Sequence, residues 1–338
     1  MALLLLLLAG IALGLAFWAL TRHWPEHVSS WRALAIPLLA LVVSFAAPGV
    51  ADAPAHHLAA LRADPYQLWD ARGVGLADLV TWPLARLLGD APAVLFSTAF
   101  FRALALVLVY ALGRVAGFGA GTALGAQAML LLMPEPAAAV ALGSVSSLLA
   151  QVLVLLLLVH LGRRFSHLDG ARDAGAAFLF LALAAATGPD PWRDVAALAA
   201  VLSVAALGTG EGRRARRLLA AAALALTAVG LVLYGGALPA LWREGVRFRP
   251  GAVATALAAG HGVLPLLLLL PGWRALGTTR SEGALALRAA LLAGALRALL
   301  GATDTALLSG PLAVLAAAGF ARLWRGDHAG ASAVQAAT

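Results

Sequence analysis

The sequence predicts an all-α fold, a polytopic transmembrane helical bundle. Of its 338 residues, 62% are hydrophobic and only 12% are charged, and the mean hydropathy is +0.91. Soluble domains carry about 25% charged residues, so this composition excludes an ordinary soluble fold. Apolar runs long enough to cross a bilayer recur along the whole chain. We therefore expect one transmembrane domain, 1–322, followed by a disordered cytoplasmic tail, 323–338.

Spans are expected where apolar residues continue with little interruption. About eleven such runs occur, at 2–20, 33–48, 93–113, 118–133, 146–161, 174–188, 194–208, 217–234, 251–271, 283–301 and 304–320. The first run lacks a basic n-region and a small-residue cleavage site, so we interpret it as a retained span and not as a signal peptide.

The arginines predict how these spans are oriented. The 24 basic residues include no lysine, and most of them fall in alternate short loops, such as the run GRRARR at 212–217. Most acidic residues fall in the opposite loops. The positive-inside rule therefore places the N-terminus outside and the C-terminus in the cytoplasm of a bacterial-type inner membrane. Because this pattern explains the net charge of +8, we expect membrane lipids and not nucleic acid as partners.

The longest polar segment, 49–92, follows the second span and is expected outside the cytoplasm, with short interfacial helices. Asp52 could cap a short helix, 53–63, through its carboxylate. It could also take a proton from an acceptor hydroxyl, as a catalytic base does. His56 lies one helical turn later on the same face. The two side chains could hold Mg²⁺ or Mn²⁺, although no spacing in the sequence requires a metal.

The same loop carries further polar residues that could line a substrate site. His57 follows His56 directly, and Asp70 and Asp78 lie further along the segment. Each carboxylate could position a base, a substrate hydroxyl or a cation. We therefore expect His56, His57, Asp70 and Asp78 to bind substrate around Asp52.

The order of residues in ADAPAHHLAALRADPYQLWDARGVGLADLVTWPLARLLG, 51–89, resembles the first extracytoplasmic loop of GT-C membrane glycosyltransferases. The resemblance covers about residues 33–190. It implies transfer of a sugar from a polyprenyl-phosphate donor to an extracytoplasmic acceptor, with Asp52 as the catalytic base or a metal-site residue. This chain departs from the family at Ala53, where an acidic residue often follows the catalytic one.

Polar residues within predicted spans are costly and tend to mark functional sites. Arg297 could bind the donor phosphate, or it could make a structural contact with an aspartate, such as Asp304, or with a carbonyl. His261 lies between two glycines and could bind substrate or form an interhelical hydrogen bond. Arg243 and Arg247 could meet a lipid phosphate outside the membrane or simply contact headgroups.

Two other functions remain open from the sequence. A transporter or flippase for a lipid or small solute would use Arg297 and His261 near the bilayer midplane. A non-catalytic subunit of a membrane complex would use its apolar faces to bind membrane protein partners. Polar groups that converge beneath the 49–92 loop would favour the enzyme, and convergence at the midplane would favour transport.

Overall fold

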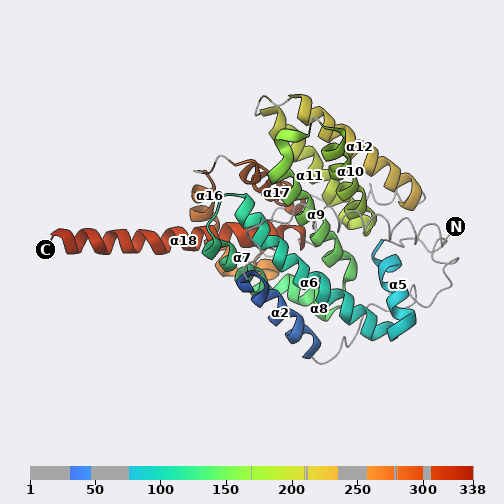
Figure 1. Ribbon diagram of the computed structural model, residues 1–338, viewed down its shortest axis with the longest axis horizontal. Helices are drawn as coiled ribbons and strands as arrows, with labels where there is room; N and C mark the ends of the chain where they lie inside the picture. The colour runs from blue at the N-terminus through green and yellow to red at the C-terminus, as the bar shows by residue number, and fades with distance from the viewer. Residues whose placement is uncertain are drawn as a thin grey trace.

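The computed structural model describes residues 31–46, 76–168, 170–208, 210, 212–234, 257–277, 279, 281–299 and 306–337. Within these ranges the regular structure is entirely helical (Figure 1). The helices are α2 (Trp31–Ala46), α5 (Leu76–Leu88), α6 (Asp90–Val115), α7 (Ala120–Leu132), α8 (Pro134–Ala141), α9 (Val145–Arg164), the 3-10 helix η2 (Phe165–His167), α10 (Ala171–Ala186), α11 (Pro189–Gly208), α12 (Gly212–Tyr234), α15 (Val263–Leu267), α16 (Leu269–Gly277), α17 (Glu282–Leu299) and α18 (Ala306–Ala337).

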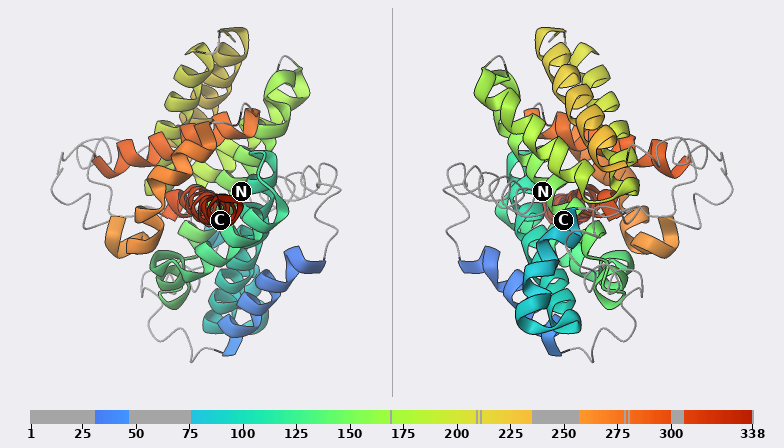
Figure 2. Two further views of the ribbon diagram at one scale, coloured as in Figure 1. Left: turned by 90° about the vertical axis from the view of Figure 1, so that its left-hand side faces the viewer. Right: turned by 90° about the vertical axis from the view of Figure 1, so that its right-hand side faces the viewer.

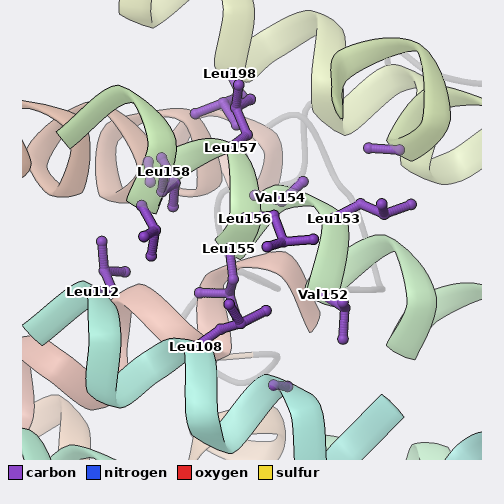
Figure 3. Close-up of a cluster of buried hydrophobic side chains, with 14 of the residues drawn as sticks. Leu108, Leu112, Val152, Leu153, Val154, Leu155, Leu156, Leu157, Leu158 and Leu198 are labelled. Carbon is purple, nitrogen blue, oxygen red and sulfur yellow. The ribbon is translucent and has the colours of Figure 1, made fainter. Parts of the chain in front are cut away.

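Helix α9 forms the centre of the bundle. Every residue from Leu148 to Leu161 is buried, because α6, α10 and α17 pack around this helix. Figure 3 shows its leucine and valine side chains meeting Leu108 and Leu112 of α6 on one side and Leu198 of α11 on another. A helix that is apolar on all sides is expected to be enclosed by other helices, and the predicted span 146–161 is confirmed as such a helix.

Four described helices, α6, α9, α11 and α12, are long and apolar enough to cross a membrane. The number rises to five if α7 and α8, which are bent by 52° at their junction, form one broken span. Large apolar side chains also remain exposed on outer helices, for example Val42 on α2 and Leu224 on α12, at 64% and 66%. These features are consistent with a helical membrane protein. The eleven-span topology remains a prediction.

The predicted span 251–271 is not one continuous helix in its described part. The chain is helical over 257–261, breaks at Gly262 and continues as the short helices α15 and α16. Gly262 has a φ of +82°, which glycine adopts without steric cost. Pro265 then lies in α15, where the missing N–H does not interrupt a long hydrogen-bond ladder.

Two pairs of glycines allow helices to cross at short distance. A Cβ atom on Gly162 of α9 would lie 2.8 Å from the Cα of Gly283 on α17. A Cβ atom on Gly319 of α18 would lie 2.9 Å from the backbone nitrogen of Gly272 on α16. Small residues at such crossings let helix backbones approach closely within a membrane.

Helix α18 begins inside the bundle and extends beyond it to Ala337 (Figure 1). Figure 2 views the molecule along its long axis and shows α18 end-on, with the other helices arranged around it. The helix covers 323–337, which belong to the segment 323–338 that the sequence predicts as a disordered cytoplasmic tail. Alanine is abundant in this segment and has the highest intrinsic helix propensity. The cytoplasmic tail remains a prediction.

Candidate functional site

Most of the predicted loop site lies outside the described residues. This holds for Asp52, His56, His57 and Asp70, and also for Arg243 and Arg247 in the later basic segment. Their roles remain predictions, as does the metal site at Asp52 and His56. Within the described residues, no group of three histidine, aspartate or glutamate side chains is arranged to hold a metal ion.

Asp78 is the one acidic residue of the predicted loop site that the structure describes. It lies in the first turn of α5, where the helix dipole favours a carboxylate, and only 8% of it is exposed. Tyr234, at the end of α12, is also buried, and its hydroxyl donates to the carbonyl of Ala185 on α10 at 3.1 Å. Asp78 is therefore a buried residue of α5 and not part of an open loop.

Arg297 forms an ion pair with Asp194, which the sequence did not identify as its partner. The Nε of Arg297 on α17 donates to Oδ1 of Asp194 on α11 at 2.5 Å, and each side chain is 12% exposed. The two helices pack side by side. Asp194 is near the start of α11 and Arg297 is near the end of α17, so the pair lies at the end predicted to face outside.

Two other arginines in apolar helices donate hydrogen bonds to backbone carbonyls in the last turn of a neighbouring helix. Arg102 of α6 donates to the carbonyl of Leu131, in the last turn of α7, at 3.2 Å. Arg288 of α17 donates to the carbonyl of Leu276, in the last turn of α16, at 2.7 Å. The final carbonyls of a helix have no donor within that helix, so these arginines satisfy them and have a structural role.

His261 lies in a cluster with Glu135 and Ser309. Its Nδ1 is 3.4 Å from Oγ of Ser309 on α18 and 3.6 Å from Oε2 of Glu135 on α8. The imidazole is buried, with 1% of the residue exposed, and its Nε2 has no hydrogen-bond partner. The sequence predicted an interhelical contact or a substrate site here, and the interhelical contact is present.

The cluster lies near the middle of the bundle. Arg102, which contacts the last turn of α7, is the thirteenth of the 26 residues of α6. Glu135 lies three residues after the end of α7, in the first turn of α8. Two helix breaks meet at this depth, because a Cβ atom on Gly262 would lie 3.9 Å from Cδ of Pro134. Sequence reasoning noted Gly262 but missed Glu135 and Ser309, whose positions depend on how α8 and α18 pack.

Arg297 and His261 therefore belong to separate polar contacts, one near the predicted outer end and one near the middle of the bundle. No family model matches the chain, and no curated protein or solved structure matches it. The fold is consistent with the class of helical membrane proteins.

Proposed function

We propose that this protein is an integral membrane glycosyltransferase of the GT-C type. It transfers a sugar from a polyprenyl-phosphate donor to an acceptor on the outer side of a bacterial-type cytoplasmic membrane. The observation that carries the proposal is the contact of Arg297 with Asp194. It supplies a fixed guanidinium group at the end of the bundle that the predicted acidic loop would face.

The geometry of the ion pair suits Arg297 for binding a phosphate. The hydrogen bond to Asp194 is donated by Nε, and it does not use the two terminal nitrogens of the guanidinium. A planar guanidinium can bind phosphate oxygens with two parallel hydrogen bonds. The carboxylate would hold the orientation of the side chain while the terminal nitrogens bind the anion.

In this proposal Asp52 supplies the base. Its carboxylate takes the proton from the acceptor hydroxyl, and the hydroxyl oxygen forms a bond to the anomeric carbon of the sugar. The bond between that carbon and the phosphate oxygen breaks, and polyprenyl phosphate leaves with its negative charge near Arg297. A cation fixed before the reaction stabilises charge that develops on a leaving group.

The role of Arg297 is tested by Arg297→Lys in a sugar-transfer assay with purified protein in lipid nanodiscs. Lysine can still pair with Asp194 but cannot bind phosphate through a planar fork. We expect transfer to fall about tenfold or more, with a higher KM for the donor. Arg288→Lys, on the same helix, serves as the matched control and should retain activity. Equal transfer by wild type and Arg297→Lys would contradict the proposed role.

Transport is a second candidate, favoured by the two helix breaks. The breaks at Pro134 and Gly262 lie next to each other near the middle of the bundle. Transporters place substrate sites at breaks of this kind near the membrane midplane. Transbilayer movement of a fluorescent lipid in proteoliposomes would support this function, and sugar transfer without such movement would favour the enzyme.

A further inference from the structure

The polar cluster of Glu135, His261 and Ser309 is not explained by sugar transfer. The three residues come from separate segments, α8, the helix at 257–261 and α18. Their polar atoms meet at a single imidazole nitrogen, Nδ1 of His261. Ionisable side chains within membrane bundles are costly and often form proton pathways.

The surroundings of His261 contain few charges. Glu135 is the only ionisable residue of α8, and the described helices α7 and α15 contain none. Helix α18 carries none before Arg322, and α9 carries no acid or arginine before Arg163. From α6, Arg102 lies nearby, where it donates to the Leu131 carbonyl. Among the residues that the structure describes, Glu135 is therefore the nearest countercharge for a protonated His261.

The two neighbours of Nδ1 suit two different protonation states. When the imidazole is neutral with its hydrogen on Nε2, the Ser309 hydroxyl can donate to Nδ1. When the imidazole is protonated, Nδ1 becomes a donor and the Glu135 carboxylate can accept from it. The distances of 3.4 Å to Ser309 and 3.6 Å to Glu135 allow either partner to approach by a small side-chain rotation.

We propose that Glu135 and His261 form a proton-binding site at the meeting point of the two broken helices. The side chain of Glu135 is 16% exposed whereas that of His261 is fully buried, so Glu135 receives the proton first. The proton then leaves the carboxylic acid oxygen and bonds to Nδ1. The products are the Glu135 carboxylate and a protonated imidazole, whose Nδ1–H donates to that carboxylate, and the Ser309 hydroxyl no longer donates to Nδ1. This inference does not depend on sugar transfer.

The site is tested by nuclear magnetic resonance of the full chain in nanodiscs, with ¹⁵N-labelled histidine. The signal of His261 is assigned by its loss in His261→Gln. We expect both ring nitrogens to change from the neutral to the protonated pattern as the pH of the sample is lowered. His167, which is exposed, provides a second histidine signal for comparison within the same sample.

Glu135→Gln separates a proton-binding pair from a purely structural hydrogen bond. The amide retains similar shape but removes the countercharge, so the protonated fraction of His261 at a given pH should fall by at least about tenfold. Ser309→Ala should preserve protonation while changing the neutral signal. An unchanged His261 titration in Glu135→Gln, or a His261 that stays neutral at every pH, would overturn the proposal. Either result would leave the proposed glycosyltransferase activity unaffected.

Discussion

Arg297 and Asp194 are 103 positions apart in the chain, yet the Arg297 Nε donates to the Asp194 carboxylate at 2.5 Å. The pair joins α17 to α11, and only 12% of each side chain is exposed. A charge removed from water to this extent is stable only with a partner and hydrogen bonds. The pair therefore fixes how these helices pack as well as the orientation of the guanidinium.

The ion pair of Asp194 and Arg297 should contribute to the free energy of unfolding. Asp194→Leu leaves the guanidinium buried without its carboxylate, so we expect the free energy of unfolding to fall by about 3–5 kcal/mol. The double variant Asp194→Leu with Arg297→Met removes both charges and should recover most of this loss. Unfolding in detergent micelles measures both values. A double variant that is less stable than the single one would contradict the account.

The close approach of Gly283 on α17 to the C-terminal end of α6 predicts a second effect on stability. In Gly283→Ala, the new methyl group would overlap the backbone of Val115 and Ala116. We expect a loss of about 1–3 kcal/mol, as in overpacked cores. Gly175→Ala is the matched control, because a Cβ atom there meets no atom within 4 Å. Thermal unfolding should leave Gly175→Ala at least as stable as wild type. Equal destabilisation of both variants would contradict the close approach of Gly283 to the end of α6.

Gln127 should hold α2 against the rest of the bundle. Its Nε2 donates to the carbonyls of Ala33 on α2 and Leu106 on α6, at 2.9 and 3.1 Å. Gln127→Leu removes both bonds, and we expect a loss of about 1–2 kcal/mol with faster amide hydrogen exchange in α2. Thr98→Val provides a control, since the Thr98 hydroxyl bonds only within α6. Unchanged exchange in α2 would show that these bonds do not anchor the helix.

The predicted orientation can be tested by cysteine labelling, because the chain contains no cysteine. Leu142, between α8 and α9, is 57% exposed and should lie outside. His167, in η2, is also exposed and should lie in the cytoplasm. We expect a membrane-impermeant maleimide to label Leu142→Cys in intact cells and to label His167→Cys only after permeabilisation. The reverse pattern would show that the protein has the opposite orientation in the membrane from the one that its arginines predict.

The helical architecture could be predicted because apolar length is a local property of the sequence. The leucine and valine run at 146–161 allowed only a buried or membrane helix, and α9 is such a helix. The break at Gly262 was harder to predict, since a single glycine is also tolerated within a helix. Its effect became clear only with the positive φ and the packing against Pro134.

The pairing of polar groups could be predicted only in part. The sequence indicated that Arg297 needs an anionic partner, and it offered Asp304 or a donor phosphate. It did not indicate Asp194, because that choice depends on α11 packing beside α17. Glu135 and Ser309 were missed for the same reason, since neither residue has a distinctive spacing relative to His261.

The proposed glycosyltransferase activity is tested by sugar transfer with purified protein in lipid nanodiscs, using a panel of polyprenyl-phosphate sugars and comparing wild type with Asp52→Asn. Asparagine retains the shape of the side chain and is also a good helix N-cap, so the change removes mainly the base. We expect sugar transfer by wild type and a fall of about a hundredfold or more in the transfer rate of Asp52→Asn. No donor consumption by wild type, or equal transfer by both proteins, would contradict the proposed activity.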